Sequence, residues 1–203
     1  MKAALIRFFL IFFFAVPFVA NAKMKKLEFL SKFSEANLLM DESFWNQSIN
    51  LWKLLLEEYP NHPNINYKLG LCYLETANSK TEALQYLEIA CQKRLIRNYD
   101  PQDPTEKRAP VEALYHLGRA QALSLQIDAA LASFEKVKKT FAAKHKFHSD
   151  ASHEIEMCNT AKEMIAAPKN FIITNVGMEI NTLGNEYSPV LTLDETTMFF
   201  TRR

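Results

Sequence analysis

The sequence predicts a mainly α-helical protein that is built from repeated helical hairpins, with β-structure beginning near its carboxyl end. Three observations support this fold class. Only four of the 203 residues are glycine, which argues against a glycine-rich nucleotide-binding or all-β protein. Residues 64–90 and 111–137 place large and small side chains in the same order. After residue 170 the apolar residues change from helical spacing to short β-branched and aromatic runs.

The amino-terminal 22 residues have the three parts of an export signal. A basic start is followed by an apolar run over residues 8–19, and Ala20-Asn21-Ala22 supplies the small residues of a cleavage site. The apolar run is too short to span a bilayer. We therefore expect cleavage after Ala22 and a mature chain that begins at Lys23. An uncleaved membrane anchor is the alternative.

The charge balance gives no reason to expect a polyanionic ligand. Loss of Lys2 and Arg7 with the signal would leave 22 basic and 23 acidic residues. Such a balance offers no electrostatic attraction for nucleic acid or for an anionic lipid surface. We expect no nucleic acid, no small-molecule substrate and no cofactor.

The two similar stretches indicate helical hairpins. Each has a Leu-Gly pair midway in its first helix, where the missing side chain lets the second helix approach closely. Each then has an alanine at the crossing point on the second helix and a large apolar residue four positions later. These residues are Leu69, Gly70, Ala83 and Leu87 in one stretch and Leu117, Gly118, Ala130 and Phe134 in the other. This order is the tetratricopeptide pattern.

An earlier copy of the hairpin precedes these two. Ala36 lies 34 residues before Gly70, the usual repeat length. The helix after it carries the small, large, medium and helix-ending residues of the pattern in order. These are Ser48, Trp52, Leu55 and Pro60. Trp52 belongs to an apolar stripe at helical spacing, which indicates a packing residue and not a ligand cage.

An inserted loop and a capping helix complete the helical part. Residues 94–110 contain three prolines and several charges without apolar periodicity, and they lengthen the repeat period from 34 to 48 residues. A helix from about His148 to Ala166 follows the last hairpin and ends before Pro168. We expect this helix to cap the array, because a terminal repeat needs a polar outer face.

The last part of the chain is predicted to begin a sheet. Phe171–Thr174 and Thr197–Thr201 are β-branched and aromatic runs that read as strands. Gly184-Asn185 and Asp194-Glu195 are turn residues between them, and we expect the second pair to form the tip of a hairpin. Two short strands are too few to bury a sheet face, so we expect little independent stability after Pro168.

The cysteines are predicted to be buried thiols. Cys72, Cys91 and Cys158 are an odd number, so they cannot all pair with one another. Cys72 and Cys91 fall at helical positions that favour small apolar residues, which favours free thiols over a disulfide.

No motif for catalysis is recognisable. The cluster His145, His148 and His153 could suggest a metal, but no cysteine or carboxylate at zinc-ligand spacing completes it, and a solvated turn is the favoured interpretation. Nucleophile elbows, phosphate-binding glycine loops and calcium-loop spacings do not occur. We predict no catalytic residue and no metal site.

Protein binding is the favoured function of the array. Arrays of this kind bind along the concave surface that the first helix of each hairpin forms. The Leu-Gly register places two groups of three residues there, and tyrosine and arginine suit contact with a partner. The six predicted residues are Asn64, Tyr67, Leu71, Glu112, Tyr115 and Arg119. Alternatively, these positions are simply solvated or are covered by the 94–110 loop.

Two blocks of residues resemble a known family. The hairpin over residues 117–137, with Ala109-Pro110 before it, is similar to the repeat region of envelope proteins from Bacteroidetes-type bacteria. Those proteins join tetratricopeptide repeats, a TolB-like β-propeller and an OmpA-like peptidoglycan-binding domain. A second block is similar to that family's passage into the first propeller blade. It consists of Ile155–Ala161, Asn175-Val176-Gly177, Ile180-Asn181, Glu186–Val190 and Phe199–Arg203.

The resemblance implies a fold of the mainly α class, a tetratricopeptide-repeat α-solenoid followed by an incomplete β-propeller blade. It divides the chain into a signal peptide at 1–22, a helical array at 23–168 and a truncated first blade at 169–203, with the chain an amino-terminal fragment. The implied function is a non-catalytic periplasmic scaffold that binds protein partners of the cell envelope, as in type IX secretion and gliding assemblies. Peptidoglycan would be bound only through a missing downstream domain. The alternative is the amino-terminal part of an exported, propeller-containing hydrolase.

Overall fold

The computed structural model of the protein describes residues 24–170 and 172–202. The predicted signal at residues 1–22 and the predicted mature terminus at Lys23 lie outside these residues. The described chain divides into two compact units, and the division falls between Lys162 and Glu163. Each unit is described by itself.

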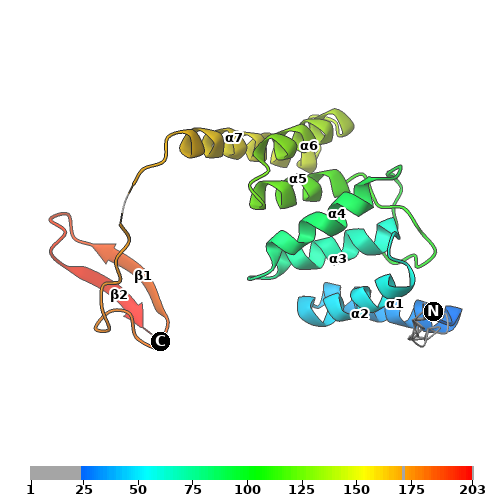
Figure 1. Cartoon of the computed structure of the whole chain (residues 1–203), viewed down its shortest axis with the longest axis horizontal. Helices are drawn as coiled ribbons and strands as arrows, with labels where there is room; N and C mark the ends of the chain where they lie inside the picture. Colours follow the sequence, from blue (N-terminus) through cyan, green and yellow to red (C-terminus); the bar gives the residue numbers. More distant parts are fainter. Residues whose placement is uncertain (1–23, 171, 203) are drawn as a thin grey trace, which may run out of the picture. The chain divides into compact units, whose positions relative to one another are not determined.

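The first unit consists of helical hairpins that stack in chain order (Figure 1). Successive helices pack against each other from the first to the sixth. The helices are α1 (Lys26–Asp41), α2 (Trp45–Glu58), α3 (Pro63–Glu75), α4 (Ala83–Cys91), α5 (Ala113–Leu123), α6 (Ile127–Thr140) and α7 (Lys146–Ala166), and the short 3₁₀ helix η1 (Lys80–Glu82) leads into α4. The prediction of a mainly helical, tetratricopeptide-like fold is confirmed.

Two glycines allow the close helix crossings that the sequence predicted. A Cβ atom on Gly70 of α3 would lie 2.6 Å from Cγ of Leu87 on α4. A Cβ atom on Gly118 of α5 would lie 2.6 Å from Cε1 of Phe134 on α6. Carbon atoms in ordinary contact are about 3.5–4.0 Å apart. Any side chain at either glycine would therefore push the two helices of its hairpin apart.

The first hairpin uses a different contact at the same place. Ala36 of α1 and Ser48 of α2 are both fully buried, and the Ser48 hydroxyl donates a hydrogen bond of 2.8 Å to the Ala36 carbonyl. Trp52 packs edge-on against Phe33, with 5.1 Å between ring centroids, and both side chains are fully buried. The earlier copy of the hairpin that the sequence predicted is therefore present, and Trp52 is a core residue.

Two clusters of buried side chains hold the array together. The larger cluster runs through α1–α5, and the smaller one joins α6 to α7 through Phe134, Val137, Ala151 and Cys158. Helix α7 thus covers the end of the last hairpin, as predicted, and it begins at Lys146, two residues earlier than expected.

The three cysteines are free thiols. Cys72 and Cys158 are buried, and Cys91 is partly buried. Burial raises the pKa of the Cys72 thiol to about 11 and that of Cys91 to about 12. Because the thiolate is the reactive form, burial makes these two thiols less reactive.

The second unit contains one antiparallel hairpin, β1 (Glu186–Leu191) with β2 (Met198–Arg202). Its register shifts between Tyr187 and Val190, which is a bulge. The tip is the predicted one, because the Asp194 carboxylate accepts hydrogen bonds from the hydroxyls of Thr192 and Thr196.

One predicted strand is wrong and one was missed. Ile172–Thr174 form no strand, and Phe171 lies outside the described residues. A strand needs a partner for its backbone groups, and none lies beside this segment in the second unit. Strand β1 was missed because Pro189 interrupts its apolar pattern.

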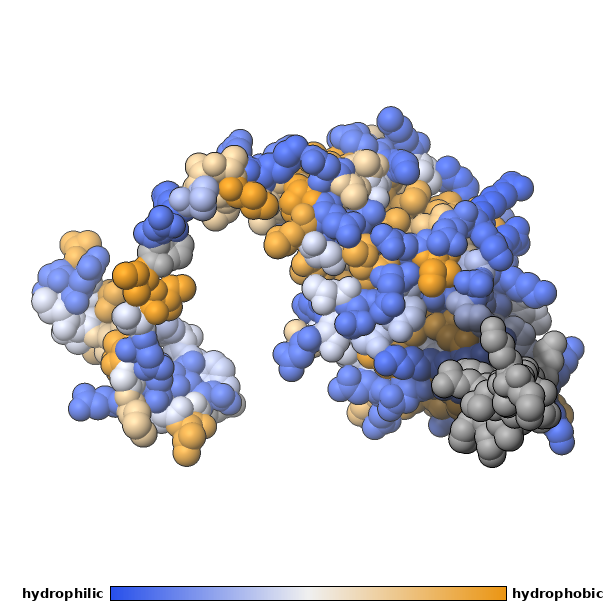
Figure 2. All heavy atoms as spheres, viewed as in Figure 1, coloured by the Kyte–Doolittle hydropathy of each residue, from blue (hydrophilic) through white to orange (hydrophobic). Residues whose placement is uncertain are grey.

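The hairpin leaves large apolar side chains exposed, as Figure 2 shows for this part of the chain. Leu183, Leu193 and Phe199 are among them. A two-stranded hairpin alone does not identify a propeller blade, so the blade stays a prediction. Among residues 24–170 and 172–202, no helix is both long and apolar enough to cross a membrane.

Candidate functional site

The predicted binding surface is formed by the first helix of each hairpin, α1, α3 and α5. We call this surface, extended by the neighbouring helix α7, the first-helix face. Its helices are linked in order by side-chain contacts. Lys68 of α3 bonds to Asn37 of α1, the Tyr67 ring of α3 lies 6.0 Å from that of His116 on α5, and the Tyr115 hydroxyl of α5 bonds to Glu154 of α7.

The segment between α4 and α5, residues 92–112, covers the α1–α3 part of this face. Its base is closed by two backbone hydrogen bonds, from Ile96 to the Ala109 carbonyl and from Val111 to the Ile96 carbonyl. Its middle reaches α1, where the Asn37 amide donates a bond of 3.1 Å to the Pro101 carbonyl. The predicted loop is thus present, and it packs against the helices instead of extending into solvent.

Two of the six predicted binding residues lie beneath this segment. Asn64 is fully buried, its amide group donates to the Glu106 carbonyl at 2.9 Å, and its carbonyl oxygen accepts from the Tyr99 hydroxyl at 2.5 Å. Tyr67 is 7% exposed and packs edge-on against Tyr99. The structure therefore shows the alternative that the sequence left open, in which the loop covers these positions.

A buried lysine is the main feature that the sequence did not predict. Lys68 is only 3% exposed, and its ammonium donates a 2.6 Å hydrogen bond to the Asn37 side chain. The ammonium also lies 5.6–5.9 Å from the ring centres of Phe33, Trp52 and Tyr99, at distances typical of cation–π interactions. Burial lowers the pKa of Lys68 to about 8. Tyr99 of the loop thus closes an internal cage around a cation.

The other four predicted residues are partly exposed and belong to the uncovered part of the face. Leu71 of α3 is half-buried, and so are Glu112, Tyr115 and Arg119 at α5. Arg119 makes only a long ion pair with Glu75, 3.8 Å between nitrogen and oxygen. These residues are accessible, and their role in binding stays a prediction.

The α5 part of the face contains two polar atoms without partners. Glu112 Oε2 and His116 Nδ1 lie one turn apart, are inaccessible to solvent and have no hydrogen-bond partner within the described chain. Burial lowers the pKa of His116 to about 3, so its imidazole is neutral at physiological pH. Each of these two atoms is an exception to the rule that buried polar groups are hydrogen-bonded.

His145, near the start of α7, belongs to an aromatic cluster. His145 stacks on Phe141 at 4.5 Å and on Phe147 at 5.7 Å. Within residues 24–170 and 172–202, no group of three histidine, cysteine, aspartate or glutamate side chains could hold a metal ion.

Similarity to known proteins agrees with the hairpin geometry. Residues 66–99 and 112–143 match the family model of the tetratricopeptide repeat. Both segments are thus similar to tetratricopeptide repeats. The chain is also similar to the crystal structure of the Sgt2 TPR domain from Aspergillus fumigatus, at 20% identity and a TM-score of 0.47, over 73% of this chain and 90% of that one. No curated protein matches the chain.

The repeats indicate a protein–protein interaction scaffold. Such repeats bind protein partners and are typically non-catalytic.

Proposed function

We propose that this protein is a non-catalytic scaffold of the bacterial cell envelope, exported by its amino-terminal signal, that binds protein partners through the first-helix face. The observation that carries the proposal is the pair of tetratricopeptide repeats, because such arrays present a continuous surface for a partner's chain.

The accessible part of the face defines where a partner would bind. The 92–112 segment covers the α1–α3 part, whereas Tyr115 and Arg119 of α5 remain partly exposed. Tyrosine and arginine are enriched among the residues that dominate binding energy at interfaces. The partner would thus contact α5 and α7.

The cellular setting of the proposal rests on the sequence. The signal-like residues 1–22 support export, and the resemblance to Bacteroidetes-type envelope proteins supports a periplasmic site near the outer membrane, in an assembly of the type IX secretion kind. In this proposal, residues 169–202 begin a TolB-like propeller, and an OmpA-like domain further along the chain would bind peptidoglycan.

Photo-crosslinking in the source bacterium tests the proposal. A photoreactive phenylalanine analogue replaces Tyr115 on the face or, as a control, the exposed Glu135 on α6. We expect a protein adduct from position 115 only, on a chain whose amino terminus is Lys23. Equal adducts at both positions, or a cytoplasmic chain that retains Met1, would contradict the proposal.

A further inference from the structure

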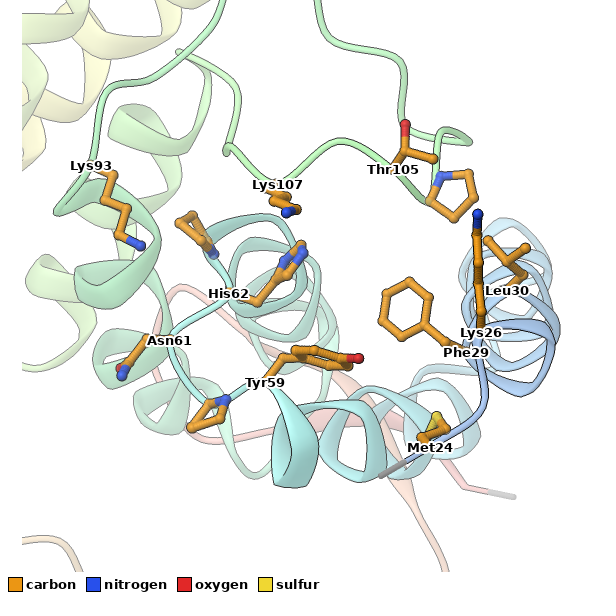
Figure 3. Close-up of a pocket in the computed structure, with 13 residues that line it drawn as sticks. Met24, Lys26, Phe29, Leu30, Tyr59, Asn61, His62, Lys93, Thr105 and Lys107 are labelled. Carbon is orange, nitrogen blue, oxygen red and sulfur yellow. The ribbon is translucent and has the colours of Figure 1, made fainter. Parts of the chain in front are cut away.

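A cavity of about 850 Å³ lies at one end of the helices (Figure 3). Its walls come from the start of α1, the turn between α2 and α3, and the inserted segment after α4. The lining includes Phe29, Tyr59–Pro63 and Lys107. The insertion that breaks the repeat period therefore builds one wall, and a regular repeat would lack this cavity.

The floor of the cavity is aromatic. Phe29 and Tyr59 pack edge-to-face with 5.5 Å between their centroids, and Tyr59 packs against His62 at 6.3 Å. All three side chains are partly buried and line the cavity. Burial and the charge of nearby Lys107 lower the pKa of His62 to about 4, so the ring is neutral at physiological pH. This floor suits an apolar or aromatic side chain.

The rim of the cavity is basic. Lys26 from the start of α1 and Lys93 and Lys107 from the inserted segment line it, and all three are exposed. No aspartate or glutamate is among the lining residues. Within the described chain none of these lysines pairs with a carboxylate, and the neighbouring Glu106 is held by Arg108 at 3.0 Å.

We propose that this cavity binds an acidic segment of a partner protein, with one aromatic side chain on the floor and flanking carboxylates on Lys26, Lys93 and Lys107. The inference rests on the proposed scaffold function and adds a second binding site to it. The basic groups surround a hollow large enough for side chains. A flat lipid surface could approach the rim but could not fill the floor, so the combination favours a peptide.

Fluorescence anisotropy with labelled peptides tests this inference on the purified chain. The probe has the sequence Gly-Asp-Glu-Trp-Asp-Glu-Gly, and the controls replace its tryptophan by alanine or its acidic residues by lysine. We expect saturable binding of the probe that weakens with added salt, and binding at least about tenfold weaker for either control peptide.

Matched variants locate the site. The triple variant Lys26→Ala, Lys93→Ala, Lys107→Ala should weaken probe binding by at least about tenfold. The triple variant Lys136→Ala, Lys139→Ala, Lys144→Ala makes the same change in net charge on other exposed lysines and should leave it unchanged. Circular dichroism checks that both variants keep their helices.

Three outcomes would overturn the inference. They are no binding of the probe, equal loss in both triple variants, and binding to phosphatidylglycerol vesicles in place of the peptide. Because the crosslinking test uses position 115, a partner adduct there without probe binding here would refute the cavity site and leave the scaffold function intact.

Discussion

The contact between Gly118 and Phe134 gives the sharpest prediction about the array. Gly118→Ala places a Cβ atom 2.6 Å from Cε1, 2.8 Å from Cζ and 2.9 Å from Cδ1 of a fully buried, rigid ring. Overpacking of this kind costs typically about 1–3 kcal/mol, and the rigid ring puts the cost near the upper value. Alanine gains about 1 kcal/mol over glycine inside a helix. The expected net loss in the free energy of unfolding is about 2 kcal/mol.

A second substitution reverses the sign of this effect. Phe134→Val removes the three ring atoms that the new Cβ would meet. In that background Gly118→Ala should gain about 1 kcal/mol from helix propensity, which gives an interaction energy of about 3 kcal/mol between the two sites. Urea unfolding followed by circular dichroism at 222 nm measures all four chains of the cycle. If Gly118→Ala has the same effect in both backgrounds, the close crossing is not what this glycine provides.

The other predictions concern the inserted segment and the buried lysine. Tyr99→Phe leaves the fully buried Asn64 carbonyl oxygen without its donor and should lower the free energy of unfolding by about 1–3 kcal/mol. The control Tyr187→Phe, on the exposed hairpin, should change the free energy of unfolding little. Equal effects of the two substitutions would contradict the packing of the 92–112 segment. The pKa of Lys68 is about 8 in the folded chain, below its ordinary value of 10.5. The unfolded chain therefore binds more protons between these pH values, and Lys68 makes stability rise with pH there. Urea titrations from pH 8 to 10 should therefore show a more positive slope of stability against pH for the wild type than for Lys68→Met; identical slopes would show that Lys68 is not buried.

The sequence predicts the hairpins well because their signals are local. The Leu-Gly pairs and the alanines recur at fixed spacing, and each encodes a contact within one hairpin. The earlier copy could also be found, because Ala36 and Ser48 occupy the same crossing place. Periodic packing is readable from a single sequence because each copy supports the interpretation of the others.

The covering of the binding face was not predictable in the same way. Residues 94–110 have little apolar periodicity, yet Ile96 and Tyr99 anchor the segment through contacts with no repeating spacing. The side chain of Asn37 bonds to Pro101, 64 positions away, and Lys68 bonds to Asn37, 31 positions away. The burial of Lys68 was not predicted for the same reason. Only the three-dimensional path of the insertion brings Tyr99 to the cage around Lys68. The sequence therefore left open whether Asn64 and Tyr67 are accessible or covered by the loop.

The affinity of a captured partner is the most direct test of the central claim, that the first-helix face binds proteins. The partner from the crosslinking experiment is purified and titrated against Arg119→Ala on the face and Lys136→Ala on α6, which remove the same charge from different sides of one hairpin. We predict at least about a tenfold loss of affinity for Arg119→Ala and an unchanged Kd for Lys136→Ala. If the Kd is unchanged for Arg119→Ala but rises for Lys136→Ala, the partner binds the second helices of the hairpins, and the account is contradicted.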